Sequence, residues 1–327
     1  MKVLVAGASG FLGSHVVEAL LAAGHDVRAL VRPTSKTAHL EERGVERAVG
    51  AVDAPETLPA ALEGCDAVVN CAGLTKARNE GEFDRVNQGG VTALLDAARA
   101  AGGRLRRFVH VSSLAAAGPS LDGAARREDE PCAPLTAYGR SKRRGEEAAL
   151  ARAGEVGVTV LRPPVIYGPR DAEIFDLFKL ARRGRIAPVL GDGNTRISMV
   201  YGPDCARAAK LCAEDGSART GAVFHVDDGG PWSYAQMADA FRAAFGVRIW
   251  SPRVPIGLFA AAAAVSEAWG KITNKAMIFN RDKVVDARHS YVCGYGLIEK
   301  ELGWTPAVAL PEGVKKTAEW YQQNGWL

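Results

Sequence analysis

The sequence lacks any strong excess of charge of one sign. Its 41 Lys and Arg residues stand against 37 Asp and Glu residues, which leaves a formal net charge of +4 over 327 residues. The basic residues are spread along the chain, whereas a nucleic-acid-binding surface gathers them into a stripe or patch. We therefore expect no nucleic-acid partner.

Long apolar runs and paired cysteines are missing as well. Met1 and Lys2 lead into a four-residue apolar run that ends at Gly7, which is too short for a signal-peptide core or a membrane span. The six cysteines show no C-x-x-C spacing, and several stand in apolar segments where cysteine acts as a small hydrophobe. These absences predict a cytoplasmic protein with no export signal, no membrane span and no metal site.

The composition that remains is that of an ordinary folded chain. Hydrophobic residues make up 47% and charged residues 24%, and there is neither an internal repeat nor a low-complexity linker. The length exceeds the usual size of one compact core. We therefore expect one large α/β domain that carries a smaller second lobe.

The first half of the chain alternates short β-rich runs with segments of helical periodicity, which is typical of a parallel sheet with helices on both faces. Strands are predicted at Lys2–Ala6, Asp26–Val31, Val45–Val49, Ala67–Asn70, Arg107–Val111 and Thr159–Leu161. Helices are predicted at Phe11–Ala23, Phe83–Ala101 and Thr136–Ala153, with Gly24 as a C-terminal helix glycine. The pattern predicts a doubly wound parallel Rossmann sheet.

The alternation stops at Arg162-Pro163-Pro164, which allows neither a strand nor a helix to continue. We place the domain boundary here, with a dinucleotide-binding domain at residues 1–162, a substrate-binding lobe at 163–327 and some crossing of the chain between them. The second lobe is predicted to be mixed. Its expected elements are a helix at Asp171–Arg183, a loop at Gly191–Asn194, a strand at Ile197–Val200 and helices that start near Ser233, Ile256 and Pro311.

A glycine-rich loop directly follows the first strand and opens the first helix. Its backbone amides and the helix dipole would face a pyrophosphate. Gly7 permits a tight turn, Gly10 lets the backbone approach the phosphates, and Gly13 lets the helix pack close to the strand. The predicted cofactor-binding residues of this loop are Gly7, Ser9, Gly10, Phe11, Leu12 and Gly13.

The end of the second predicted strand indicates which dinucleotide binds. An NAD-binding domain usually places an acid here for the adenosine ribose, but the sequence reads Leu30-Val31-Arg32-Pro33-Thr34-Ser35. Arg32 is suited to a 2′-phosphate through its planar, charged fork. The alternative interpretation is a solvated loop residue that stacks on adenine and is compatible with either cofactor. We predict NADP as the preferred cofactor and keep NAD as an alternative.

Tyr138 and Lys142 stand four residues apart in a predicted helix, and this spacing puts a phenol and an amine on one face. A free phenol has a pKa of about 10, so a catalytic tyrosine needs a nearby cation to stabilise its phenolate. Lys142 would supply that cation and would also bond the nicotinamide ribose. Alone, the pattern is also consistent with an exposed helix face.

Val111-Ser112-Ser113 ends the fifth predicted strand, at the carboxyl edge where open α/β sheets bind ligands. Ser113 is placed to hydrogen-bond a substrate oxygen while Tyr138 gives or takes its proton. Without Tyr138, a pair of turn-forming serines would be an equally good interpretation. The predicted catalytic residues are Ser113, Tyr138 and Lys142.

Together these segments resemble those of the extended short-chain dehydrogenase/reductase family, which also contains nucleotide-sugar epimerases and dehydratases. The resemblance covers nearly the whole chain. It is carried by the glycine loop, Asn70-Cys71-Ala72-Gly73, Val86-Asn87, Val111-Ser112-Ser113, Tyr138 to Lys142, and Leu161-Arg162-Pro163-Pro164-Val165-Ile166-Tyr167-Gly168-Pro169. It implies that Val86-Asn87 scaffolds the active site and that the cofactor is also contacted by Val52, Ala72, Gly73, Pro164 and Val165.

Three segments depart from the family pattern. Gly50-Ala51-Val52 stands where the family commonly has Gly-Asp-Leu, so a side-chain contact to adenine is lost and only backbone contacts remain there. The usual Gly-Thr is Gly90-Val91, and the usual Val-Asp-Asp is Gly202-Pro203-Asp204. Neither of these two changes touches the catalytic pair.

The resemblance leaves the reaction open, because reductases, epimerases and dehydratases share this machinery. Arg196 is similar to an arginine that grips nucleotide phosphates in epimerases, but reductases carry similar loops. The almost uncharged segment Pro255–Trp269 is similar to apolar lids of flavonol-reductase-like and hydroxysteroid-dehydrogenase-like members and suits a lipophilic substrate; a core or dimer helix is the alternative.

We therefore predict an NADP(H)-dependent oxidoreductase that interconverts a ketone and a secondary alcohol on a small lipophilic molecule. A nucleotide-sugar epimerase or dehydratase with bound NAD is the second hypothesis. A non-catalytic NADP-binding sensor is the third, and assembly into a homodimer is left open.

Overall fold

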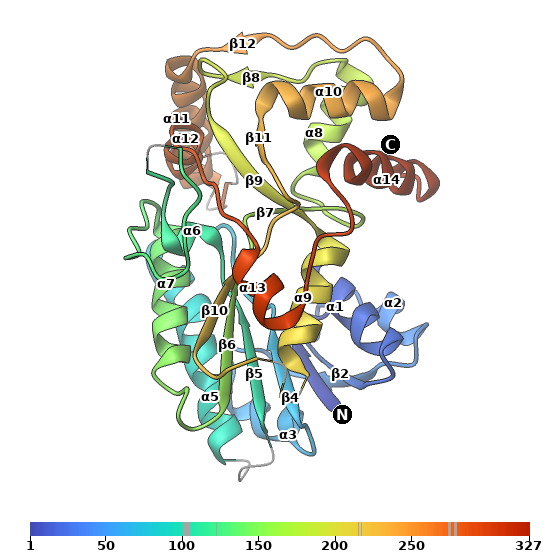
Figure 1. The fold of residues 1–327 in the computed structure, drawn as a ribbon, viewed down its shortest axis with the longest axis vertical. Coiled ribbons are helices and arrows are strands. Elements are labelled where there is room, and N and C mark those ends of the chain that lie inside the picture. Colours follow the sequence, from blue (N-terminus) through green and yellow to red (C-terminus); the bar gives the residue numbers. More distant parts are fainter. Residues whose placement is uncertain (101–104, 122, 215, 217, 274–275, 278–279) are drawn as a thin grey trace.

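The computed structural model describes residues 1–100, 105–121, 123–214, 216, 218–273, 276–277 and 280–327. A seven-stranded parallel sheet forms the lower part of the molecule (Figure 1), with the strand order β10-β6-β5-β4-β1-β2-β3. Its strands are β1 (Lys2–Ala6), β2 (Asp26–Val31), β3 (Glu46–Val49), β4 (Ala67–Asn70), β5 (Arg107–Val111), β6 (Gly157–Arg162) and β10 (Ala222–His225). The predicted doubly wound sheet is confirmed.

Alternating apolar residues along the buried strands build a core on each face of this sheet, because successive side chains of a strand point to opposite faces. Val3 and Val5 pack into one core and Leu4 and Ala6 into the other. The first core includes residues of α1 (Phe11–Ala22), α2 (Ala38–Glu41), α9 (Gly202–Ala213) and α13 (Gly296–Leu302). The second includes residues of α3 (Leu58–Leu62), α5 (Gly90–Ala100) and α7 (Ala137–Leu150).

The predicted helix Phe83–Ala101 is divided in the structure. It consists of α4 (Glu80–Phe83), a π-helical segment η2 (Asp84–Gly89) and α5, and Ala101 lies outside the described residues. The π-helical segment contains Asn87, whose side chain is fixed by partners outside the helix. Such π-helical turns frequently occur at functional sites.

A smaller second lobe lies above the sheet (Figure 1) and is mixed, as predicted. One three-stranded sheet has the order β11 (Pro231–Ser233), β9 (Arg196–Tyr201), β7 (Val165–Tyr167), and β12 (Arg253–Val254) pairs with β8 (Val189–Leu190). The remaining helices are α6 (Leu114–Ala117), α8 (Phe175–Lys179), α10 (Tyr234–Phe245), α11 (Ile256–Thr273), α12 (Arg281–Arg288) and α14 (Leu310–Gln323), with the short segments η1 (Pro55–Thr57) and η3 (Leu180–Gly184).

The predicted helix at Asp171–Arg183 begins four residues late, at Phe175. The carboxylate of Asp171 accepts hydrogen bonds from the backbone amides of Glu173 and Ile174, at 2.8 and 3.2 Å. An aspartate that bonds the following amides stabilises a turn in place of a helix. The predicted helix starts near Ser233, Ile256 and Pro311 agree with α10, α11 and α14 within one residue.

The second half of the chain also contributes to the large sheet. β10 pairs in parallel with β6, and α9 packs against α1. Some chain crossing of this kind was expected, and the division at residues 162 and 163 stays a prediction.

Candidate active site

The glycine loop has no room for larger side chains. Gly7 has a positive φ of 79°, and a Cβ there would lie 2.9 Å from the backbone nitrogen of Ala72. A Cβ on Gly13 would overlap the carbonyl oxygen of Gly7. The amide of Gly10 donates to that same oxygen at 2.9 Å, which closes the turn. Gly7 and Gly13 are therefore required, because the loop lies against the segment after β4 and α1 lies against the loop.

The N-terminus of α1 is open to an anion. Its cap residue is Gly10, which has no side chain to bond the free amides, and the first turn contains no acidic residue. Gly10 itself is exposed, whereas Ser9 and Phe11 are partly buried and Leu12 is buried. Free amides and the positive end of the helix dipole together form an anion site. This cradle fits the pyrophosphate of a dinucleotide.

The other residues predicted to contact the cofactor lie along neighbouring elements. Val52 is buried against Gly90 at the start of α5. The amide of Ala72 donates to the Asn70 side chain at 3.1 Å, and a Cβ on Gly73 would lie 3.6 Å from Nζ of Lys142. The structure therefore brings the predicted cofactor wall close to the predicted catalytic lysine.

Pro164 and Val165 lie beyond the end of β6, on the other side of this edge. The carbonyl of Pro163 accepts the amide of Leu114 at 2.8 Å, which connects this loop to the segment that carries Ser113. Val165 is exposed. Both residues are thus placed at the carboxyl edge of the large sheet.

Arg32 follows the last residue of β2 and is exposed. A turn fixes its backbone, since its amide donates to Oγ of Ser35 at 3.1 Å and its carbonyl accepts the Ser35 amide at 2.9 Å. Within the described part of the chain, its guanidinium has no hydrogen-bonding or ion-pair partner. The group is therefore free to bind a ligand beside β2.

Tyr138 and Lys142 lie one turn apart in α7, as the sequence predicts. Oγ1 of Thr136 caps the helix by accepting the amide of Gly139 at 3.1 Å. Lys142 is buried, and its Nζ donates to the carbonyl of Val111 at 2.7 Å. Because Val111 ends β5, this bond holds the lysine beside the strand that leads into Ser113.

Ser113 is the N-cap of α6, where its hydroxyl accepts the amide of Ala115 at 3.2 Å. Burial raises the pKa of Tyr138 to about 12, and a hydrogen bond with the Ser113 side chain opposes this shift. The carboxylates of Glu173 and Asp286 add to the increase in the Tyr138 pKa. The phenol is therefore protonated at neutral pH and is paired with the predicted serine.

Burial also shifts Lys142, whose pKa is lowered to about 8, although Glu146 and Cys71 oppose the shift. We expected Lys142 to stabilise the phenolate directly. In the structure its ammonium bonds Val111, and the causes of the Tyr138 shift are other groups.

Asn87 joins three segments around this pair. Its Oδ1 accepts the amide of Leu74 at 2.8 Å, and its Nδ2 donates to the Leu74 carbonyl at 3.1 Å and to Oγ of Ser141 at 2.9 Å. Ser141 stands between Tyr138 and Lys142 on α7. Asn87 therefore connects η2, the loop after β4 and α7, and the scaffold role that the family resemblance implies stays a prediction.

Sequence reasoning missed two contacts that position α7. Glu146 and Arg162 form a buried ion pair with bonds of 2.8 and 2.7 Å, and Asp282 of α12 accepts the amide of Ala137 at 3.1 Å. The first has no signal in the sequence, because Glu146 and Arg162 lie 16 residues apart in different elements. The second has no signal in the sequence, because 145 residues separate the partners.

We expected two features of the second lobe to select the substrate, namely Arg196 and the segment Pro255–Trp269. In the described residues these two features do not form a closed pocket. Nη1 of Arg196 donates to the carbonyls of Gly193 and Asn194 in its own loop, at 3.1 and 3.0 Å. The large apolar side chains of α11 are largely exposed.

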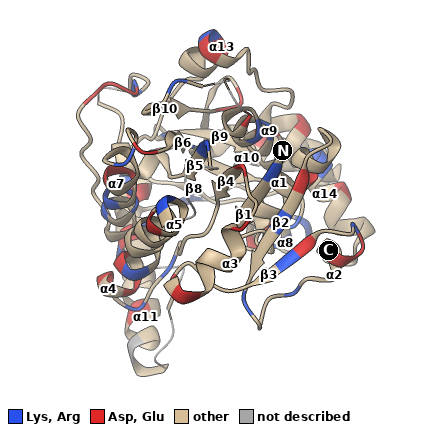
Figure 2. Cartoon of the chain, turned by 90° about the horizontal axis from the view of Figure 1, so that it is seen from below, with Lys and Arg blue, Asp and Glu red and all other residues tan. Residues whose placement is uncertain are grey.

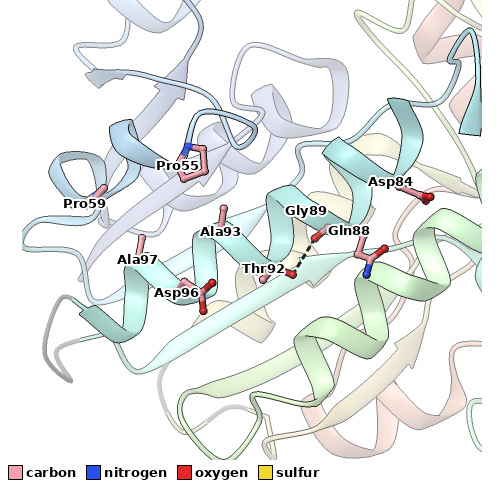
Figure 3. Close-up of a pocket in the computed structure, with 9 residues that line it drawn as sticks. All are labelled: Pro55, Pro59, Asp84, Gln88, Gly89, Thr92, Ala93, Asp96 and Ala97. Carbon is pink, nitrogen blue, oxygen red and sulfur yellow. Dashed lines mark hydrogen bonds between the residues drawn. The ribbon is translucent and has the colours of Figure 1, made fainter. Parts of the chain in front are cut away.

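A groove shown in Figure 3 contains none of the predicted site residues. It is lined by Pro55, Pro59, Asp84, Gln88, Gly89, Thr92, Ala93, Asp96 and Ala97.

Neither a metal cluster nor a membrane-spanning segment is found in the described ranges. No three His, Cys, Asp or Glu side chains there are grouped so that they could hold a metal ion. None of the helices in that part of the chain has the length and hydrophobicity to cross a bilayer.

The buried lysine predicts a pH-dependent stability. Its pKa is about 8 in the folded protein, against an ordinary value of 10.5 for a lysine in water. Between these pH values the unfolded chain holds a proton that the folded chain has released, so the free energy of unfolding rises with pH by about 3 kcal/mol. Urea unfolding of wild type and Lys142→Met at pH 7 and at about pH 10.5 measures this. The variant should gain stability relative to wild type at pH 7 and lose that advantage at the higher pH; a constant difference would contradict the assignment.

The fold and the glycine cradle define a dinucleotide-binding Rossmann protein. Residues 3–226 match the model of the NAD-dependent epimerase/dehydratase family. The chain belongs to this family, and its class of activity is that of NAD(P)-dependent oxidoreductases, epimerases and dehydratases of the extended short-chain dehydrogenase type.

Three similar proteins illustrate the activities that occur among the relatives of this chain. A ceramide reductase of Caulobacter vibrioides is 34% identical over 99% of this chain and 96% of its own length. A 4-hydroxy-2-methyl-3-oxo-4-farnesyl-3,4-dihydroquinoline-1-oxide ketoreductase of Stigmatella aurantiaca is 31% identical over 84% of this chain and 83% of its own. The solved structure of MoeE5 in complex with UDP-glucuronic acid and NAD has a TM-score of 0.77 at 25% identity and covers 99% of this chain and 100% of that one.

Proposed function

We propose that this protein is an NADP(H)-dependent oxidoreductase that interconverts a ketone and a secondary alcohol on a small lipophilic substrate. The observation that carries the proposal is the meeting of Ser113, Tyr138 and Lys142 at the carboxyl edge of the sheet, beside the glycine cradle. Two similar proteins whose names describe the reduction of lipophilic molecules support the substrate class.

Each catalytic residue has a separate role in this proposal. The protonated phenol of Tyr138 donates to the carbonyl oxygen in the reductive direction and accepts the proton in the oxidative one. Ser113 holds the same oxygen, and Lys142 supplies positive charge beside the phenol and orients the ribose. When bound, the nicotinamide supplies or accepts the hydride.

The preference for NADP rests on Arg32. The exposed guanidinium at the end of β2 occupies the place where an NAD-binding protein usually carries an acid. A 2′-phosphate would pair with its fork through charge-assisted hydrogen bonds. Thr34, Ser35 and Lys36 are the further donors close by in the sequence.

Arg32→Ala is expected to weaken NADP binding by about 10- to 100-fold, because a charge-assisted contact is lost. NAD binding should change little, since NAD has no 2′-phosphate. Isothermal titration of both cofactors measures this, with Arg127→Ala as an exposed arginine control away from β2. An equal loss for both cofactors, or a wild type that binds NAD more tightly than NADP, would show that Arg32 does not select NADP.

A nucleotide-sugar epimerase or dehydratase is the second candidate, and the similarity to MoeE5 is the observation that favours it. Arg196 weakens this alternative, because its guanidinium is already bonded to carbonyls of its own loop. A non-catalytic NADP sensor is the third hypothesis, although Ser113, Tyr138 and Lys142 are all present.

The six cysteines are free, which suits the reducing cytoplasm that we propose as the location.

One assay distinguishes the three. The protein is incubated with NADPH or NADH and a panel of lipophilic ketones, and separately with UDP-sugars and NAD, while cofactor absorbance and sugar products are followed. We expect cofactor oxidation with ketones. Epimerised or dehydrated sugars without ketone reduction would favour the second candidate, and cofactor binding without turnover of any substrate would favour the sensor.

A further inference from the structure

The helix α11 presents its apolar residues outward. Its exposed residues form one continuous face along about 24 Å of helix, which we name the α11 stripe. Leu258, Val265, Trp269 and Ile272 on this face are 64%, 71%, 61% and 77% exposed. The α11 stripe consists of Gly257, Leu258, Ala261, Ala262, Ala264, Val265, Ala268, Trp269 and Ile272.

The stripe contains no charged or polar side chain, whereas an ordinary surface helix turns its charged and polar side chains to solvent. Glu267, the acid among the side chains described on α11, lies on the opposite side and pairs with Arg281 at 3.4 Å. In Figure 2 the helix extends at the edge of the molecule. A contiguous apolar patch of this kind marks a surface that contacts a membrane or another molecule.

Cationic residues lie on the two elements next to the stripe. Lys283 and Arg288 are exposed on α12, which packs against α11, and Arg253 is exposed in β12 just before the helix begins. An apolar face with a tryptophan and a border of Lys and Arg is complementary to a bilayer whose headgroups are anionic. A second copy of this chain would bring the same cations together.

The stripe is also connected to the catalytic helix. Asp282 of α12 accepts the amide of Ala137, the residue before Tyr138. Asp286 of the same helix is close enough to raise the pKa of the Tyr138 phenol. The element that joins α11 to the body of the protein is therefore the one that lies against the catalytic end of α7.

We propose that the α11 stripe docks on the surface of an anionic lipid bilayer, so that a membrane-dissolved ketone enters beside Tyr138. This proposal rests on the proposed function for its purpose, because a lipophilic substrate resides in the bilayer. The helix lies in the interface with its apolar face among the acyl chains, and the cations of α12 and β12 contact the headgroups.

Flotation of the full chain with vesicles tests the docking. The vesicles are made of mixed phosphatidylcholine and phosphatidylglycerol, or of phosphatidylcholine alone. Wild type should bind the anionic vesicles more strongly than the neutral ones, and Val265→Glu and Trp269→Glu should each lower partitioning by about tenfold or more. Leu177→Glu on α8, which makes the same change in charge at another exposed apolar residue, should leave binding unchanged.

Turnover of a water-soluble ketone is measured on the same samples. Unchanged turnover with lost flotation in the two α11 variants supports the proposal and shows that they are folded. Turnover of the ketone by a wild type that does not float overturns the docking alone, and flotation without any ketone turnover overturns the proposed function alone. A wild-type dimer that ignores vesicles and becomes monomeric on Trp269→Glu would show that a second copy covers the stripe.

Discussion

Tyr138→Phe is expected to lower kcat by about 10²- to 10⁴-fold, the loss typical of a positioned acid or base. The substitution removes the hydroxyl that pairs with Ser113 and keeps the ring that lies against Phe83. Cofactor binding should therefore survive. Steady-state kinetics with the substrate found by the ketone panel, together with cofactor titration, measures both quantities.

Two neighbouring variants serve as comparisons. Ser113→Ala should mainly slow turnover, whereas Lys142→Met should reduce both turnover and cofactor affinity, because the lysine serves the ribose as well as the phenol. A kcat near the wild-type value for Tyr138→Phe would falsify the assignment of the acid.

Glu146→Gln is expected to lower the free energy of unfolding by about 3–5 kcal/mol, because it leaves the Arg162 guanidinium buried without its counter-charge. Both side chains are almost fully buried and share two hydrogen bonds. The pair also joins α7 to the end of β6. Urea unfolding monitored by circular dichroism measures the change.

Glu147→Gln is the matched control, one residue further along the same helix. Glu147 pairs with Arg143 on the surface at 2.9 Å, and the loss of such a pair costs about 1 kcal/mol or less. Replacing both buried partners by Met should recover much of the lost stability, since no charge is then left in the core. A small effect of Glu146→Gln would show that solvent reaches Arg162.

The Rossmann half was predictable because its information is local. The apolar runs of β1, β2, β4 and β5 have the same bounds in the sequence prediction and in the structure, and the placement of Gly7 and Gly13 follows from backbone sterics alone. The positions of Tyr138 and Lys142 on α7 and of Ser113 after β5 were predictable because helical spacing and strand order place them, and their catalytic roles stay predictions. These positions need no knowledge of the second lobe.

What escaped prediction depends on contacts between distant residues. The division of the helix at Asp84–Gly89 coincides with Asn87, whose partners Leu74 and Ser141 belong to other segments. The Arg162–Glu146 pair and the Asp282 contact arise only when α7, β6 and α12 are assembled. The outward orientation of α11 could not be predicted either, since an apolar helix in a sequence is most simply interpreted as a buried one.

The place of β10 at the edge of the large sheet has a consequence for biosynthesis. Its partner β6 ends at Arg162, while β10 begins only at Ala222. A nascent chain that has left the ribosome as far as β6 thus exposes an unpaired strand edge for as long as about 60 further residues take to be translated, some 3 to 12 seconds at typical rates. During that interval the sheet is open to pairing with another nascent chain, so aggregation on overexpression should decrease with a chaperone that shields the edge.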